Sequence, residues 1–328
     1  MKHIKFTGNY YDIGLQHGRI YRENGLKLDK VKVSPMLPEQ IAVYKKFYPE
    51  ILEELRGIAE GGNFDKEKIM SIYLCGEIHW YRQKLHIPAC TIFGIKTKGD
   101  ILVGRNLDWI PITKKVMEIY DRHIPGKFRF TGISDMLIGS EYDVKNKFLF
   151  HDSIDGLNEK GLYIGITFAY CDRWRHGISW RDVNKYIMEN CENVDQALAV
   201  FRRIPLSIPK NFFIADTERM VVVEHTSEQF RVLESDLLIK TNHYLDPELK
   251  KEDTILKHRP AHSTYVRYYK TLQKINSYKE INYDDLLDIL KVSFQDCEFG
   301  SNIKTIWSLT LDMKNKMYEM HTDEKVRL

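Results

Sequence analysis

The sequence predicts an α+β protein in which helical layers cover stacked antiparallel sheets. Helix-rich stretches alternate with strand-rich stretches along the chain, in the order helices, strands, helices, strands, helices, strands. Consecutive strands are joined by tight turns, which favours antiparallel sheets, because parallel neighbours need a long crossover connection. No internal repeat or low-complexity linker interrupts the 328 residues, so we expect a single domain over 1–328.

The first 88 residues are predicted to be mostly helical. In the stretch 8–25, apolar and aromatic side chains recur at helical spacing, and the stretches 37–62 and 64–85 continue the helical pattern. Pro49 is expected to begin a new helix within the second stretch, and the glycine pair after Glu60 is expected to end it.

From Cys90 the pattern changes to short strands separated by turns. Strands are predicted at 91–97, 100–109, 116–124, 127–133 and 147–154. A hairpin over 154–170 follows, and its turn residues Asn158 and Gly161 suit positive φ.

The second half of the chain alternates again. Residues 179–204 are predicted to be helical, with Ser179 as the N-cap. Residues 211–244 return to strands, the stretch 258–293 is helical, and 305–322 forms a closing hairpin.

Composition and charge exclude several classes of protein. The chain carries 49 Lys and Arg against 46 Asp and Glu, and a net charge of +3 is too small to indicate nucleic acid as the main partner. No run is long enough to span a membrane, and the N-terminus lacks the apolar core of a secretory signal. The five cysteines are scattered without a C-x-x-C pair, which favours a reducing cytoplasm. There is no H-E-x-x-H, P-loop or G-x-G-x-x-G, so no metal or cofactor is expected.

Cys90 follows Pro88 and Ala89 at the predicted start of a strand. A free cysteine is most often a small buried apolar residue, and this interpretation stays open. A cut between Ala89 and Cys90 would instead leave cysteine as a new N-terminus, whose α-amine can act as the base toward its own thiol. That arrangement dispenses with a catalytic histidine, and no histidine here lies in a recognisable triad motif.

Arg105 and Asp108 lie on the return strand of the hairpin that begins at Cys90. The hairpin brings this strand beside Cys90, about 5 Å away across the sheet. Alternation along the strand places Arg105 on one face and Asp108 on the other. The two are either an ion pair at a sheet edge or functional groups. In the second case Asp108 can hold the α-ammonium of Cys90, and Arg105 can lower the pKa of the thiol or orient a substrate carbonyl.

Three further features are candidates on position and residue type. Asn242 ends an apolar strand, either as an Asx-type terminator or as a side-chain donor to an oxyanion. Arg267 is by default an arginine on a helix surface. The stretch 172–181, which contains Trp174, either stacks on nucleic acid or forms a loop that lines a substrate cleft, and the near-neutral charge favours the loop.

Five segments, taken in order, resemble the N-terminal-nucleophile cysteine hydrolases. These segments are A-C-T-I-F, G-R-N-L-D-W, D-G-L-N-E-K-G-L, a late strand ending T-N-H-Y, and a final T-I-W-S-L hairpin. The similarity is greatest to the acyl-coenzyme A:6-aminopenicillanic acid acyltransferase branch, which residues 8–18 and the segment G-I-S-W-R-D-V also resemble. Choloylglycine hydrolases and the acid ceramidase group are more distant relatives.

The resemblance implies a four-layer αββα sandwich and self-cleavage between Ala89 and Cys90. It divides the chain into a helical N-terminal segment, 1–89, and a nucleophile-bearing segment, 90–328. It also implies that the Cys90 thiolate attacks a linear, non-peptide C–N amide.

Four further residues match the family's motifs. Arg105 and Asp108 match its paired arginine and aspartate, Asn242 matches the oxyanion-hole asparagine, and Arg267 loosely matches a late active-site arginine. Choloylglycine hydrolases carry a second asparagine where this chain has Thr167, so Thr167 or a backbone N–H must supply that donor. This departure disfavours bile-salt hydrolysis in particular.

The sequence therefore predicts a cytoplasmic amide hydrolase or N-acyltransferase whose partner is a small N-acyl amide, with acyl-CoA or an acceptor amine as a further substrate of a transferase. Trp109 and Trp174 are additional candidates for substrate contact. The alternative is an uncleaved, non-catalytic protein that binds a small ligand on the same fold. No nucleic acid, membrane or cofactor is expected, and the acyl group, the amine and a homo-oligomeric state stay open.

Overall fold

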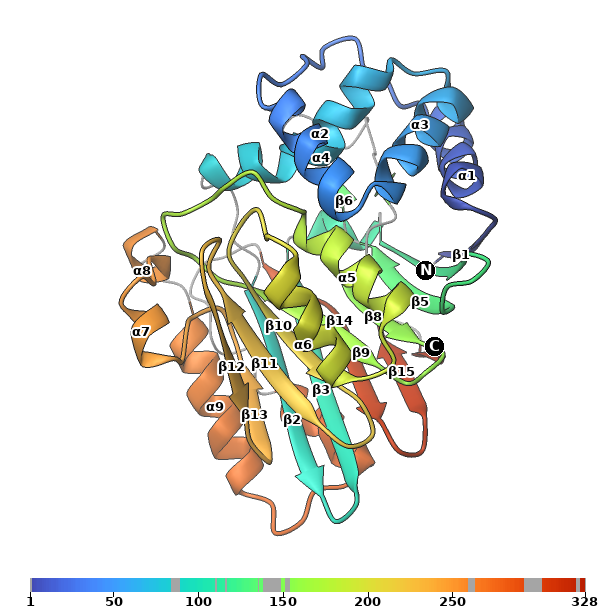
Figure 1. Cartoon of the computed structure of the whole chain (residues 1–328). Coiled ribbons are helices and arrows are strands. Elements are labelled where there is room, and N and C mark those ends of the chain that lie inside the picture. Colours follow the sequence, from blue (N-terminus) through green and yellow to red (C-terminus); the bar gives the residue numbers. More distant parts are fainter. Residues whose placement is uncertain are drawn as a thin grey trace.

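The chain folds as two sheets stacked face to face, with helices on both outer faces (Figure 1). The computed structural model describes residues 2–83, 89–109, 111–115, 117–134, 136–137, 149–150, 154–258, 263–291, 303–322 and 325–327. The N-terminal helices gather at one end of the stacked sheets, at the top of the view. The predicted α+β sandwich, with its order of helices, sheet, sheet and helices, is confirmed.

The N-terminal segment contains one strand and four helices within the described residues. These are β1 (Lys2–Thr7), α1 (Tyr10–Glu23), α2 (Leu37–Phe47), α3 (Glu50–Gly62) and α4 (Lys66–Arg82). The predicted helix boundary at Pro49 is confirmed, because α3 begins at the next residue. Glycines let α1 approach α3 closely, since a Cβ at Gly14 would lie 2.1 Å from the carbonyl oxygen of Glu54.

Strand β1 is a strand that the sequence did not predict, in a segment that is otherwise mostly helical as expected. It pairs in parallel with β4 (Glu118–His123), so that Lys2 faces Glu118 and Thr7 faces His123. The predicted antiparallel arrangement therefore has an exception at this edge, where one pair is parallel. The partner strand lies far along the chain, so no local turn residue signals the pairing.

The larger sheet has eight described strands and packs its inner face on the smaller sheet. Their spatial order is β1, β4, β5 (Phe130–Ser134), β8 (Asp155–Asn158), β9 (Tyr163–Phe168), β10 (Lys210–Ala215), β11 (Met220–His225) and β12 (Phe230–Glu234). The predicted β8–β9 hairpin is confirmed, and Gly161 has φ +87°. Asn158 does not have the expected positive φ. Its side-chain oxygen instead accepts from the backbone N–H of Lys160 and Leu162, which stabilises the turn as an Asx motif.

The smaller sheet has six described strands and carries Cys90. Their spatial order is β13 (Leu237–Lys240), β2 (Ala89–Thr97), β3 (Asp100–Trp109), β14 (Lys304–Asp312), β15 (Met317–His321) and β16 (Lys325–Arg327). Strands β2 and β3 form the predicted hairpin, whose turn is made by Gly99 at φ +92°. Strands β6 (Met136–Leu137) and β7 (Leu149–Phe150) pair separately, and most of the predicted strand 147–154 lies outside the described residues.

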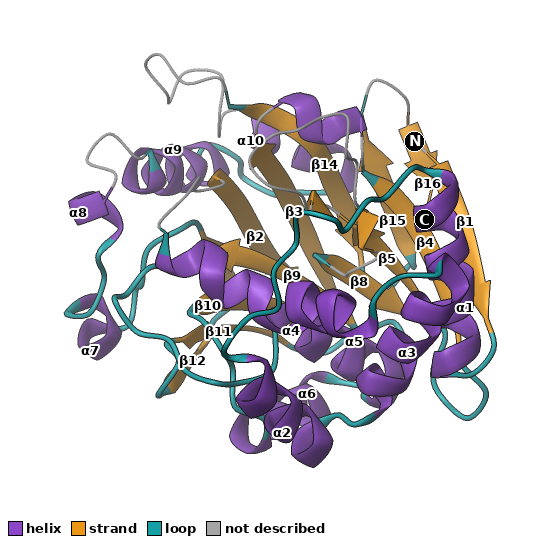
Figure 2. Ribbon diagram, turned by 90° about the horizontal axis from the view of Figure 1, so that it is seen from above, coloured by secondary structure: helices purple, strands orange, loops and turns teal. Residues whose placement is uncertain are grey.

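Helices cover the outer face of each sheet (Figure 2). The predicted helical region 179–204 is two helices, α5 (Trp180–Asn190), capped by Ser179, and α6 (Val194–Arg203), which lie on the larger sheet. Helices α9 (Thr264–Asn276) and α10 (Leu286–Lys291) lie on the smaller sheet. The short helices are α7 (Pro247–Lys250), α8 (Ile255–His258), η1 (Pro111–Lys115) and η2 (Tyr283–Asp285).

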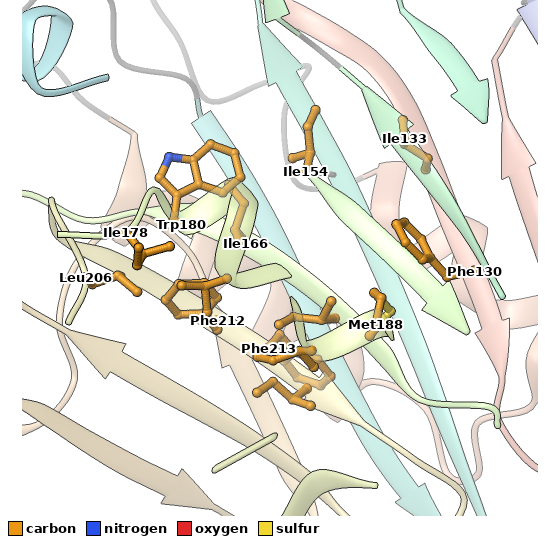
Figure 3. Packing of buried hydrophobic residues seen from close by; sticks show 14 of the residues in the cluster. Phe130, Ile133, Ile154, Ile166, Ile178, Trp180, Met188, Leu206, Phe212 and Phe213 are labelled. Carbon is orange, nitrogen blue, oxygen red and sulfur yellow. The ribbon is translucent and has the colours of Figure 1, made fainter. Parts of the chain in front are cut away.

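The core is apolar on both faces of the larger sheet. In β10, Phe212 packs against Phe201 of α6, with ring centroids 4.7 Å apart. The neighbouring Phe213 points to the other sheet, where a Cβ at Gly94 of β2 would lie 2.5 Å from its ring. Both phenylalanines are fully buried with Trp180 of α5 (Figure 3). Among the described helices, none has the length and apolar character needed to cross a membrane.

Candidate active site

Cys90 lies near the start of β2, between β13 and β3, and its side chain is fully buried. Side chains alternate along a strand, so Cys90, Ile92 and Gly94 share the face that looks toward the larger sheet. The contact between the Gly94 position and Phe213 identifies this face. The thiol therefore lies between the two sheets. The backbone of Cys90 forms hydrogen bonds with Asn242, which follows β13, and with Arg267 of α9.

Arg105 of β3 lies on the same face as Cys90, because it is paired with Ile92 across the hairpin. Its side chain is fully buried. The guanidinium Nε donates to the Asp155 carboxylate at 3.2 Å, Nη1 donates to the backbone carbonyl of Asn106, and the group lies 5.0 Å from the Trp307 ring. Burial works to lower the pKa of Arg105, but the charge and hydrogen bond of Asp155, together with the charges of Cys90 and Tyr163, outweigh burial and raise the pKa, so this residue remains a cation.

Asp108 is paired with Ala89 across the same hairpin, which places it directly beside the bond between Ala89 and Cys90. The register confirms the predicted alternation, since Asp108 belongs to the opposite face from Arg105. The Thr305 hydroxyl donates to Asp108 at 2.7 Å. The strand β14 that supplies Thr305 has a bulge at this level, between Thr305 and Trp307.

Asn242 follows β13 and is fully buried beside Cys90. Its side-chain oxygen accepts from the backbone N–H of Cys90 at 3.0 Å and from Nη2 of Arg267 at 2.6 Å. Its side-chain nitrogen donates to the Phe168 carbonyl at 3.2 Å, and its backbone N–H donates to the Thr264 hydroxyl at 2.8 Å. These contacts fix the orientation of the side-chain amide. Asn242 therefore does not merely end a strand, because its side chain links Cys90 to Arg267.

Arg267 of α9 is fully buried and lies at the centre of the site. The default interpretation as a surface arginine is wrong. Nη1 donates to the carbonyl of Cys90 and to the Thr91 hydroxyl, and Nε donates to the Ser263 hydroxyl at 2.9 Å. One arginine thus binds both the Cys90 backbone and the Asn242 side chain, and it ties the outer helix to the start of β2.

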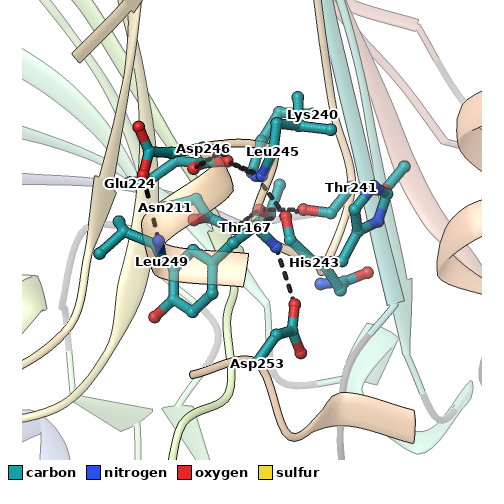
Figure 4. A network of polar contacts seen from close by, with 12 residues as sticks. Thr167, Asn211, Glu224, Lys240, Thr241, His243, Leu245, Asp246, Leu249 and Asp253 are labelled. Carbon is teal, nitrogen blue, oxygen red and sulfur yellow. Dashed lines mark hydrogen bonds and ion pairs between the residues drawn. The ribbon is translucent and has the colours of Figure 1, made fainter. Parts of the chain in front are cut away.

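Thr167 of β9 is buried near Asn242, but its hydroxyl is already engaged. The hydroxyl donates to the Thr241 carbonyl at 2.5 Å and accepts from the side-chain nitrogen of Asn211 at 3.1 Å (Figure 4). Asn211 lies directly opposite Thr167 on β10, and the sequence analysis did not single it out. Thr167 therefore helps to hold the loop that carries Asn242, together with a second buried amide.

A buried ion pair holds the other side of this loop. Lys240 donates to the Glu224 carboxylate and to the His243 carbonyl. Glu224 also accepts from the backbone N–H of Leu245 and Asp246 (Figure 4). The residues on either side of Asn242 are therefore fixed by side chains of β11 and β13.

The two tryptophans predicted to contact substrate lie in different surroundings. Trp109 ends β3 and its ring lies 6.4 Å from those of both Trp80 and Phe168, the residue whose carbonyl binds Asn242. Trp174 is 36% exposed and contacts Arg82 in α4. Within the described residues, no hydrogen bond or ring contact joins Trp174 to the Cys90 group.

Burial is the largest influence on the Cys90 thiol, and it raises the pKa above the ordinary value of a cysteine. Arg105 and Arg267 act in the opposite direction, and the Asp108 carboxylate raises the pKa further. The net shift is upward while Ala89 and Cys90 are joined. The thiol is therefore protonated at neutral pH, and it needs a base to become a nucleophile.

Two cavities of about 520 and 640 Å³ lie away from this group. The first is lined by residues such as Lys5, Arg129 and Tyr318, and the second by residues such as Leu37 and Met70. Neither is lined by Cys90. Among the residues that the structure describes, no group of three histidine, cysteine, aspartate or glutamate side chains could hold a metal ion.

The fold corresponds to that of a known class of protein. Two stacked sheets flanked by helices are the architecture of N-terminal-nucleophile hydrolases. A variant of the conjugated bile acid hydrolase from Clostridium perfringens is 14% identical, with a TM-score of 0.50 over 73% of this chain and 92% of that chain. At this identity the likeness concerns the fold alone.

A sequence family gives the more specific assignment. The family model described as acyl-coenzyme A:6-aminopenicillanic acid acyl-transferase matches residues 95–326, and the chain belongs to this family of acyltransferases and linear-amide hydrolases. The matched range includes Arg105, Asn242 and Arg267 but begins after Cys90.

Two other solved structures are also similar. The N-acylethanolamine-hydrolyzing acid amidase ortholog of Caenorhabditis elegans is 16% identical, with a TM-score of 0.48 over 68% of this chain and 92% of that chain. The penicillin V acylase of Agrobacterium tumefaciens is 15% identical, with a TM-score of 0.43 over 71% of this chain and 82% of that chain. Comparison with curated proteins gives no match.

Proposed function

We propose that the protein is a cysteine amide hydrolase or acyltransferase that cuts itself between Ala89 and Cys90 and then acts on the linear amide of an N-acyl small molecule. The observation that carries this proposal is the convergence on Cys90 of Arg105, Asn242 and Arg267, which come from three separate parts of the chain. Each is fully buried, and each binds or electrostatically influences Cys90. Buried charged and polar groups are costly unless they are paired, so their collection around a thiol supports a chemical role.

The first reaction on this proposal is the cut itself. The Cys90 sulfur attacks the Ala89 carbonyl carbon, a C–S bond forms, and the C–N bond to Cys90 breaks. The thiol proton passes to the leaving nitrogen, which becomes the free α-amine. Water then hydrolyses the Ala89 thioester, which leaves a carboxylate on Ala89 and restores the thiol. Asp108, which lies beside this bond, is assigned to hold the new α-ammonium.

In the second reaction the Cys90 α-amine takes the thiol proton, and the thiolate attacks the substrate amide carbonyl. The side-chain nitrogen of Asn242 and a backbone N–H stabilise the oxyanion. In the uncut chain that nitrogen donates to the Phe168 carbonyl, so substrate binding must replace this contact. The substrate amine leaves with the proton, and a thioester remains on Cys90. Water completes a hydrolysis, whereas an acceptor amine completes an acyl transfer.

Intact mass measurement and N-terminal sequencing of the purified protein test the cut. We expect two pieces, 1–89 and 90–328, and a second piece that begins with cysteine. The Cys90→Ala variant should remain one chain of 328 residues, whereas Cys191→Ala, which removes another buried cysteine, should be cut normally. An uncut wild-type chain that also fails to form an acyl-enzyme with an N-acyl probe would refute the proposal.

A second candidate function is small-ligand binding by an uncut chain. It is favoured by the buried thiol of Cys90 and its raised pKa, which describe an unreactive cysteine. Calorimetric titration with N-acyl amides, followed by analysis of the products, separates the two. Saturable binding without release of the amine supports the binding protein.

A further inference from the structure

We propose that Asp155 and Tyr163 are positioning residues that hold the Arg105 guanidinium in place for chemistry at Cys90. The inference rests on the proposed function and deepens it. It concerns two side chains of the larger sheet that bind Arg105 rather than the thiol, and to which the sequence alone assigned no role.

The contact crosses from one sheet to the other. Arg105 belongs to β3 of the smaller sheet, whereas Asp155 begins β8 and Tyr163 begins β9 of the larger sheet. Arg105 Nε lies 3.2 and 3.4 Å from the two carboxylate oxygens of Asp155. The Tyr163 hydroxyl donates to the nearer of these oxygens at 2.5 Å. Tyr163 therefore holds the carboxylate, and the carboxylate holds the guanidinium.

This arrangement leaves one end of the guanidinium uncommitted. Nε is bound by Asp155 and Nη1 by the Asn106 carbonyl, whereas Nη2 has no hydrogen-bond partner among the described residues. Two of the three nitrogens are thus enough to fix the plane of the group. Since Arg105 lowers the pKa of the Cys90 thiol, its charge acts on the reacting sulfur while its orientation is set by Asp155.

The surrounding sequence makes room for the pair. A Cβ on Gly165 of β9 would lie 2.3 Å from the Tyr163 hydroxyl and 2.8 Å from an Asp155 oxygen, closer than real Cβ atoms come. Glycine at this position is therefore required by the pair. Burial and the Asp155 charge raise the pKa of Tyr163 well above its usual range, so the phenol remains a donor at every pH of interest.

If the ion pair between Arg105 and Asp155 only joined the two sheets, a different set of results would be expected. Removal of Asp155 would then reduce stability and leave the thiol unaffected, apart from the loss of a nearby negative charge. That loss alone lowers the pKa of the thiol, because the Arg105 charge becomes less screened. A positioning role predicts the opposite direction, since an Arg105 that is no longer held moves away from Cys90.

The test is the titration of the Cys90 thiol, followed by thiolate ultraviolet absorbance as a difference from the Cys90→Ala protein. In Asp155→Asn we expect the midpoint to rise by about one pH unit, a tenfold loss of thiolate. Tyr163→Phe should raise the midpoint by a smaller amount. In Asp155→Glu the midpoint should return part of the way to the wild-type value. Turnover should fall about 10²-fold in kcat with little change in KM, as expected for a misplaced group.

The matched control is Glu189→Gln, which weakens another buried arginine pair, that of Arg122, and should leave the midpoint unchanged. An unchanged or lowered midpoint in Asp155→Asn overturns the inference, because Arg105 then keeps its place without Asp155. The titration does not require the chain to be cut or to turn over substrate. A wild type without activity would therefore refute the proposed function separately, while the midpoints still decide the role of Asp155.

Discussion

Two buried arginines, Arg105 and Arg122, occupy contrasting sites on the two sheets. Arg122 of β4 has every guanidinium nitrogen bound, with two contacts to Glu54 and one to Glu189 at 2.6 to 3.1 Å. Arg105 has one carboxylate, Asp155, at 3.2 Å and an Nη2 that makes no hydrogen bond with a described residue. Both side chains are almost completely inaccessible to solvent. They differ in how completely their guanidinium groups are paired.

The difference separates a structural arginine from one suited to chemistry. A buried cation that is fully bound stabilises the contact of the elements around it, and in Arg122 these elements are α3, α5 and the larger sheet. A buried cation with a remaining donor can act on a neighbouring group, and beside Arg105 that group is the Cys90 thiol. Incomplete pairing of a buried arginine next to a thiol is thus the more informative signal.

The Arg122→Met variant is expected to show the largest effect, a loss of stability. The change removes the arginine that binds both Glu54 and Glu189 in the core, and we expect a loss of about 3–5 kcal/mol in the free energy of unfolding. Chemical denaturation measures it. The Cys90 titration should be unaffected, and a shift in that titration would show that the two arginines are not independent.

Arg105→Met is the matched change at the other site. It leaves one carboxylate, that of Asp155, which keeps its hydrogen bond from Tyr163, so we expect a smaller loss of about 2 kcal/mol. The thiol loses the cation that lowers its pKa, and self-cleavage should stop or slow sharply. Mass spectrometry of the freshly made protein follows the cut. Normal cleavage in this variant would contradict the view that Arg105, unlike Arg122, acts on Cys90.

A buried histidine beside an arginine extends the comparison to pH. His225 of β11 is 2% exposed, and burial, with the Arg175 charge, lowers its pKa to about 3. Between the ordinary histidine pKa of 6.5 and about 3, the unfolded chain binds a proton that the folded chain does not. Stability contributed by this group therefore falls as the pH falls through that window, by about 1.4 kcal/mol per pH unit.

Urea denaturation across this pH range measures the slope in the wild type and in His225→Gln. The glutamine cannot titrate, so the variant should lose this part of the pH dependence. If the free energy of unfolding varied with pH by the same slope in both proteins, His225 would be ruled out as the source of the pH dependence.

The smallest expected effect comes from Tyr10→Phe, which removes one hydroxyl from the Arg122 group. The Tyr10 hydroxyl donates to Glu189 at 2.5 Å, but Tyr48 donates to the same carboxylate at 2.7 Å and remains. We expect a loss of about 1–2 kcal/mol. Thermal denaturation measures this loss, and Tyr48→Phe is the matched variant. A loss as large as that of Arg122→Met would show that the ion pair between Arg122 and Glu189 depends on the Tyr10 hydroxyl.

The residues that the sequence revealed are those carried by short local patterns. Cys90, Arg105 and Asp108 lie on one hairpin, so strand alternation and a turn at Gly99 were enough to place them together. Asn242 ends an apolar strand, which is also a local signal. The order of helices and strands was predictable for the same reason, because each hairpin or helix carries its own turn or cap.

Contacts between distant elements were not predictable. Arg267 was expected on a helix surface, and only the packing of α9 on β2 buries it. Asp155 and Tyr163 belong to a turn-flanked hairpin with no sign of the arginine on the other sheet. Strand β1 has its partner β4 far along the chain, so its pairing was missed for the same reason. The extent of the N-terminal segment 1–89 as a separate piece stays a prediction.

The hydrogen bond from the Cys90 backbone nitrogen to Asn242 has a consequence for timing. Scission of the Ala89 bond would turn an amide nitrogen with one hydrogen into an amine with at least two, without moving the atom. The acceptor that the nitrogen already has would serve the amine as well, and the nitrogen lone pair, no longer conjugated with a carbonyl, could then take up a proton. The base would thus already be in place when hydrolysis of the Ala89 thioester restores the thiol.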